Sequence, residues 1–161
     1  MSESEAITDF VKHARQFVSW CRTEHEGKSK TQFKVEALQR LAAIYSSALY
    51  LPQVEFTPAP VAPATTEVEC QVVGQNLLAL PFRFYWDLCE PATASEVPEP
   101  GCGDLFDDFQ DIYKDLSSGL WLYDSGYVEA AVYSWREMFR LHWGPHVVGA
   151  LHALHSFEYG E

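Results

Sequence analysis

Apolar residues recur at steps of three and four over most of this 161-residue chain. That spacing places them on one side of a helix, and it is typical of amphipathic helices rather than strands. Two helix starts are marked by polar residues, because Ser2 and Glu5 have the S-x-x-E spacing of a capping box and Asp104 is a candidate N-cap. The predicted helices cover residues 4–26, 29–51, 67–80, 104–122, 128–142 and 145–156.

Proline-rich loops at 52–66 and 91–103 separate these helices. Residues 67–80 leave two alternatives open, because the first half alternates like a strand and the second half has helical spacing. A helix is preferred, since no other segment offers a comparable strand to pair with it. An aromatic cluster over 82–86 predicts a short helix or turn. The chain is therefore predicted to be all-α, a compact bundle of five or six helices that forms a single domain over 1–161.

Acidic side chains outnumber basic ones by 23 to 11, which gives a formal net charge of −12. The excess lies in residues 41–161, which hold 17 acidic and four basic side chains. A surface of this sign repels phosphate backbones and attracts cations or basic proteins. We therefore expect no nucleic-acid partner, and a basic protein is the predicted partner. Negative charge that only keeps the protein soluble is the alternative.

Several classes of protein are disfavoured by what the sequence lacks. No apolar run approaches the roughly 18 residues that span a bilayer, and the start shows no basic region followed by an apolar core. The four cysteines are widely spaced without a C-x-x-C pair, which indicates reduced thiols in a cytoplasmic protein. The motifs H-E-x-x-H, G-x-x-x-x-G-K-[ST], G-x-S-x-G and G-x-G-x-x-G are absent. No cofactor and no membrane association are predicted.

Five aspartates follow one another at steps of three and four along the predicted helix 104–122. The apolar side chains of the same helix centre on a direction roughly 140° away from them, at about 100° per residue. The aspartates are therefore predicted to face solvent, as a hydrated surface or as the surface that binds a basic partner or a cation. They are Asp104, Asp107, Asp108, Asp111 and Asp115.

His142 and His146 are the main candidates for metal ligation, because they lie four residues apart. Zinc would need further ligands, and a carboxylate of Asp111 or Asp115 would have to reach them from the opposite side of its own helix. A His142 that is bonded to a carbonyl or carboxylate, with no metal, is therefore preferred. The favoured function is a non-enzymatic interaction or accessory module with no catalytic residue. A metal- or ligand-dependent helical-bundle enzyme that uses these four residues is the alternative.

Short strings in the C-terminal half carry a family resemblance. They are D-I-Y-K-D-L from Asp111, H-W-G-P-H from His142 and A-L-H-A-L-H from Ala150, with Y-W-D from Tyr85 upstream. In this order they resemble a bacterial family of small acidic helical proteins that is catalogued as a domain of unknown function. The resemblance covers about residues 75–156, and it implies a bacterial cytoplasmic protein with an all-α fold. It carries over no catalytic residue.

Overall fold

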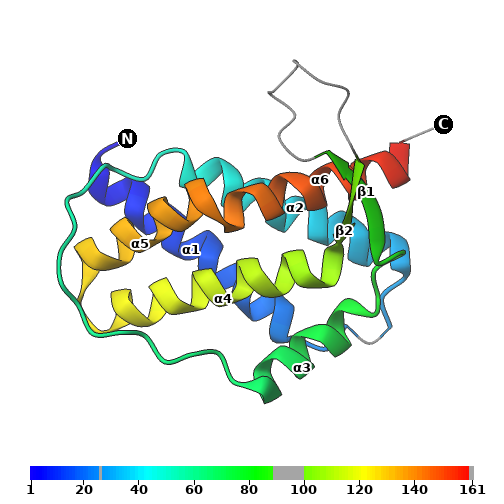
Figure 1. The fold of residues 1–161 in the computed structure, drawn as a ribbon, viewed down its shortest axis with the longest axis horizontal. Helices are drawn as coiled ribbons and strands as arrows, with labels where there is room; N and C mark the ends of the chain where they lie inside the picture. The colour runs from blue at the N-terminus through cyan, green and yellow to red at the C-terminus, as the bar shows by residue number, and fades with distance from the viewer. Residues whose placement is uncertain (26, 89–99, 160–161) are drawn as a thin grey trace.

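The computed structural model describes residues 1–25, 27–88 and 100–159. Within these residues the chain forms six helices and a single two-stranded sheet (Figure 1). The predicted all-α bundle is thus confirmed, with the small sheet as an addition. In chain order the elements are α1 (Glu3–Arg22), α2 (Lys30–Ala48), α3 (Glu67–Leu77), β1 (Phe84–Leu88), β2 (Pro100–Asp104), α4 (Leu105–Asp124), α5 (Val128–Leu141) and α6 (Trp143–Tyr159).

Polar side chains cap the starts of the first four helices. Reciprocal capping boxes begin α1, α2 and α3; in the first, the Ser2 hydroxyl accepts from the Glu5 backbone N–H and the Glu5 carboxylate accepts from Ser2 N–H. The box of Thr66 and Glu69 gives α3 a defined start, so the helical alternative for this segment is confirmed. Asp104 caps α4 as predicted, by accepting from the N–H of Phe106.

Helices α4, α5 and α6 pack against one another, and α5 and then α6 run antiparallel to α4 (Figure 1). Helices α1 and α2 pack against this group and against each other. Burial of large aromatic side chains fixes these helices relative to one another, at roughly 1.5–3 kcal/mol for each fully buried apolar side chain. The fully buried aromatic residues are Phe10, Phe17, Phe33, Phe109, Tyr113, Trp135 and Trp143.

The two strands form an antiparallel hairpin in which Tyr85 lies opposite Gly103. The prediction of a short helix or turn over 82–86 is therefore wrong from Phe84 onward, and so is the prediction of a loop at residues 100–103. The second strand reads P-G-C-G-D and has no β-branched or large apolar residue, so it carries no strand signal of its own. The rest of that expected loop, up to residue 99, lies outside the described residues.

The first proline-rich connection, 52–66, contains no helix or strand, as predicted. It leads from α2 to α3 around the end of the bundle opposite the hairpin (Figure 1). Among the described residues, no helix combines the length and the apolar composition needed to cross a bilayer. Cys21 is buried in the core, and burial raises the pKa of its thiol well above the ordinary value.

Candidate metal centre

Three aspartates of α4 lie against α6 and do not face open solvent. Asp108 is only 5% exposed, and the side chains of Asp111 and Asp115 are each 17% exposed. The prediction that these three carboxylates face water is therefore wrong. The angle between the aspartates and the apolar side of α4 does not reveal what covers them: α6 packs along the flank of α4 on which the aspartates lie, so that flank is an interhelical seam.

Two histidines lie across this seam, and each is held by a different aspartate. His142 caps the C-terminus of α5, and its Nδ1 donates to Asp115 Oδ2 at 2.7 Å. His146, in the first turn of α6, donates from Nδ1 to Asp108 Oδ1, also at 2.7 Å. Because an ionised carboxylate only accepts hydrogen bonds, each Nδ1 carries the hydrogen. In the neutral imidazole, each Nε2 then keeps a free lone pair.

Asp111 lies between the two aspartates that hold the imidazoles, and both free nitrogens approach it. Its Oδ2 is 3.7 Å from His142 Nε2 and 3.6 Å from His146 Nε2. Its other oxygen, Oδ1, accepts from Lys114 Nζ at 2.7 Å. Lys114 therefore fixes the carboxylate while Oδ2 stays directed at the histidines.

Asp111, His142 and His146 form a group that can bind one metal ion. One ligand atom from each of Asp111, His142 and His146 lies within 4.8 Å of the other two. Zinc bonds of about 2.0–2.2 Å at tetrahedral angles put ligand atoms about 3.4 Å apart. The two nitrogen-to-oxygen distances, 3.7 and 3.6 Å, are already close to that value. Two histidines and one carboxylate are also the ligand set of many iron(II) sites.

Tyr85 of β1 extends the network beyond the helices. Its hydroxyl donates to Asp108 Oδ2 at 2.8 Å, so both oxygens of this carboxylate are engaged. Burial raises the pKa of Tyr85 and also that of Asp108, whereas the hydrogen bond to Asp108 raises the pKa of His146. In the metal-free protein, His146 thus keeps its second proton to a higher pH than an ordinary histidine does.

The structure brings together all four residues that the sequence offers as metal candidates, Asp111, Asp115, His142 and His146. Asp108, expected at the solvent-facing surface, belongs to the same network, and so does Tyr85, which is not among the predicted site residues. The i, i+3, i+7 spacing of the aspartates matches an i, i+4 pair of histidines at the junction of two helices that run antiparallel to α4, and that match is the available signal. Tyr85 lies in the string Y-W-D that carries part of the family resemblance, but this string does not indicate the contact with Asp108, because that contact depends on the hairpin.

The two remaining aspartates of the predicted partner surface lie at the start of α4. Asp104 caps the helix and pairs with Arg83 at 2.7 Å, whereas Asp107 is exposed. The five aspartates therefore do not form one continuous exposed face. Binding of a basic protein at these positions stays a prediction from charge.

Comparisons with known proteins agree with the fold described above. The crystal structure of protein BF1032 from Bacteroides fragilis, a structural-genomics target, matches with a TM-score of 0.77. The match covers 97% of this chain and 94% of that chain at 22% sequence identity, which shows a shared fold. No curated protein matches the chain. A family model described as a domain of unknown function, DUF5063, matches residues 1–160, and it confirms the resemblance to a family of this kind. The chain belongs to the DUF5063 family.

Proposed function

We propose that this protein binds one divalent transition-metal ion through Nε2 of His142, Nε2 of His146 and the carboxylate of Asp111. The observation that carries the proposal is the shared direction of the two Nε2 atoms, which lie 3.7 and 3.6 Å from one Asp111 oxygen. A network of ion pairs alone needs one carboxylate for each imidazole, and Asp115 and Asp108 already fill that role. Carboxylates that hold Nδ1 while Nε2 faces a common point are the usual support of metal-ligating histidines.

Three protein ligands leave room for further ligands at the ion. A four-coordinate zinc ion keeps one open position, and a six-coordinate ion keeps three. The His142 side chain is 40% exposed, so the open side of the site can be reached from solvent. An open position is characteristic of catalytic metal sites, where the ion activates a water molecule or polarises a bound substrate. This favours the metal-dependent enzyme over the non-enzymatic module.

Metal titration of the untagged protein tests the proposal. We expect one zinc or cobalt(II) ion per chain in a chelator competition, and we expect His142→Ala, His146→Ala and Asp111→Ala each to lose most of this affinity. The matched control is His152→Ala, which removes an exposed histidine of the same helix that lies outside the three-residue group. Circular dichroism verifies that each variant remains folded.

Two results would overturn the proposal. One is a wild-type protein that binds no ion in the micromolar range or tighter, where Kd values near 1 μM correspond to about −8 kcal/mol. The other is binding that survives the substitutions at His142, His146 and Asp111, whatever the His152→Ala control does.

Two further expectations rest on charge and on the thiols. The excess of acidic side chains supports binding to a basic protein, and a pull-down that retrieves one basic partner and weakens with added salt tests this. Cys21, Cys70 and Cys102 are free thiols among the described residues, which supports the expected cytoplasmic location.

A further inference from the structure

The β1–β2 hairpin reaches the metal site through Tyr85, and two glycines make room for this side chain. Gly103 lies opposite Tyr85 in the hairpin, and a β-carbon at this position would overlap the Tyr85 ring. Gly149 of α6 lies next to the phenol group, and a β-carbon there would overlap the hydroxyl oxygen. The absence of both β-carbons lets the hydroxyl reach the buried carboxylate of Asp108.

Asp108 connects this hydroxyl to a proposed metal ligand. Its Oδ2 accepts from Tyr85 at 2.8 Å, while its Oδ1 accepts from His146 Nδ1 at 2.7 Å. A carboxylate bonded at both oxygens has little freedom to rotate. The orientation of the His146 ring therefore depends on a side chain that belongs to the hairpin and not to the bundle.

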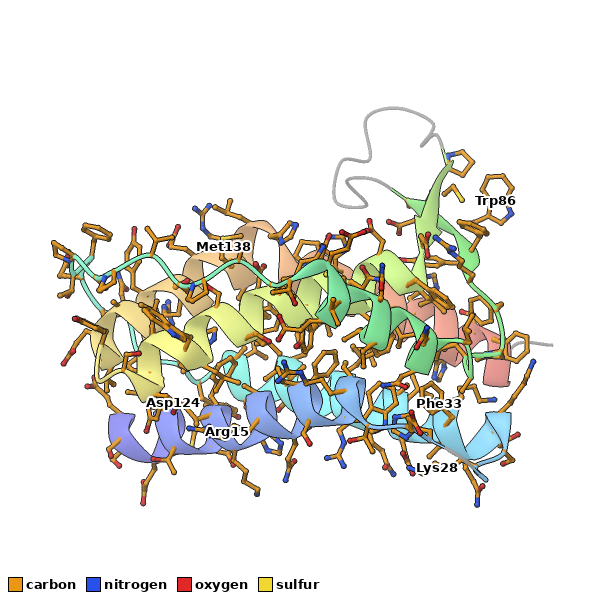
Figure 2. All side chains as sticks on the ribbon, turned by 90° about the horizontal axis from the view of Figure 1, so that it is seen from below. Arg15, Lys28, Phe33, Trp86, Asp124 and Met138 are labelled. Carbon is orange, nitrogen blue, oxygen red and sulfur yellow. The ribbon has the colours of Figure 1, made fainter. Side chains whose placement is uncertain are left out.

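The hairpin also borders a cavity. Trp86, Asp87 and Leu88, which follow Tyr85, line a mostly apolar cavity of about 710 Å³ together with Pro145 and Gly149 of α6. Its size lies within the range of small-molecule sites, which is about 300–1,000 Å³. Tyr85 thus joins the wall of this cavity to the support of His146. Figure 2 shows Trp86 at the outer edge of the hairpin, where its side chain is largely exposed.

We propose that Tyr85 is a positioning residue for the metal site, because it holds Asp108 so that His146 Nε2 is directed at Asp111. The inference rests on the proposed metal-binding function. It assigns the hairpin a role in setting metal affinity, although the hairpin supplies no ligand itself. Loss of a group that supports a metal ligand typically costs about 10–100-fold in affinity. Tyr85 acts one contact further out, so we expect a loss of up to about tenfold.

Tyr85→Phe isolates the hydroxyl, because the ring can stay packed between the two glycines. Zinc affinity should fall, and the cobalt(II) absorption spectrum should change with the altered geometry at His146. In the metal-free protein, at a pH at which the His146 ring is neutral, ¹⁵N NMR of this ring should show Nδ1–H in the wild type and a mixture of tautomers in Tyr85→Phe. Tyr50→Phe, the same change at an exposed tyrosine, is the control and should match the wild type in all three measurements.

Gly149→Ala gives a second and independent test. The added methyl group overlaps the Tyr85 hydroxyl, whereas the ring carbon that bears this hydroxyl is 3.5 Å away, an ordinary contact distance. Gly149→Ala should therefore weaken zinc binding in the presence of the hydroxyl and have little added effect in the Tyr85→Phe background. Such non-additivity is expected when two substitutions act through one contact.

The outcomes separate the two proposals. A wild-type protein that binds no metal overturns the proposed function, and the His146 tautomer in Tyr85→Phe still decides whether Tyr85 positions this ring. If the wild type binds zinc but Tyr85→Phe keeps both its affinity and the His146 tautomer, Tyr85 has no positioning role. Additive losses in Gly149→Ala and Tyr85→Phe would likewise contradict action through the hydroxyl.

Discussion

Replacing Asp108 with alanine should destabilise the metal-free protein more than any other single charge removal on α4. Asp108 is 5% exposed and accepts from both His146 and Tyr85. Removing one partner of a buried ion pair typically costs about 3–5 kcal/mol, because the other group is left without compensation. That is a large fraction of the roughly 5–15 kcal/mol that holds most domains folded. Asp108→Asn keeps an acceptor for His146 without the charge, so its loss should be smaller.

Urea unfolding in the presence of a chelator measures these losses without any contribution from metal. The matched control is Asp107→Ala, which removes the same charge from the neighbouring exposed position of α4. We expect this control to stay within about 0.5 kcal/mol of the wild type, as surface substitutions usually do. If Asp108→Ala were no more destabilising than Asp107→Ala, the reasoning about the buried network would be refuted.

The remaining predictions concern pH, packing and capping. Because the pKa of His146 is raised in the metal-free fold, zinc affinity should increase with pH up to that pKa. At a pH below this pKa, zinc binding should release about one proton per ion, which calorimetry in different buffers can show. The same raised pKa links stability to pH. Below the ordinary histidine pKa near 6.5, the ion pair of His146 with Asp108 contributes fully to the stability of the metal-free protein, and this contribution is lost as the pH rises through the pKa of His146 in the folded protein. Gly119→Ala places a methyl group against the Trp135 indole and should lower the free energy of unfolding by about 1–3 kcal/mol. Tryptophan fluorescence should shift as well, and a variant as stable as the wild type would contradict the tight packing at this position. Asp104→Ala removes the N-cap of α4 and should lower the free energy of unfolding by roughly 1 kcal/mol, whereas Asp104→Asn should retain most of the stability in thermal unfolding. Equal losses in the two variants would show that the charge of Asp104, and not its role as a cap, matters.

The helices could be predicted because their signals are local. Periodicity and the Ser2–Glu5 and Asp104 caps determine where α1 and α4 begin, and these depend on residues within one turn. The hairpin could not be predicted in the same way. Its second strand contains two glycines and a proline, and it is held by pairing with β1 and not by its own residue preferences.

The candidate site shows where reasoning from a single helix stops. The angular separation of the aspartates from the apolar side of α4 predicts that they leave the core, but it does not say what covers that flank. His142, at the end of α5, and His146, in α6, reach the same seam because α5 and then α6 run antiparallel to α4, and this is a property of the packed bundle. A search for matching acidic and histidine spacings on pairs of helices would have paired Asp108 with His146 and Asp115 with His142.

An anomalous diffraction map from crystals grown with zinc or cobalt(II) tests the central claim most directly. We expect one peak per chain between α4 and α6, at about 2.0–2.2 Å from Nε2 of both His142 and His146 and from an Asp111 oxygen. Asp108 and Asp115 should still hold the two Nδ1 atoms. A peak bound through Nδ1, or a clear map with no peak at this seam, would contradict the account.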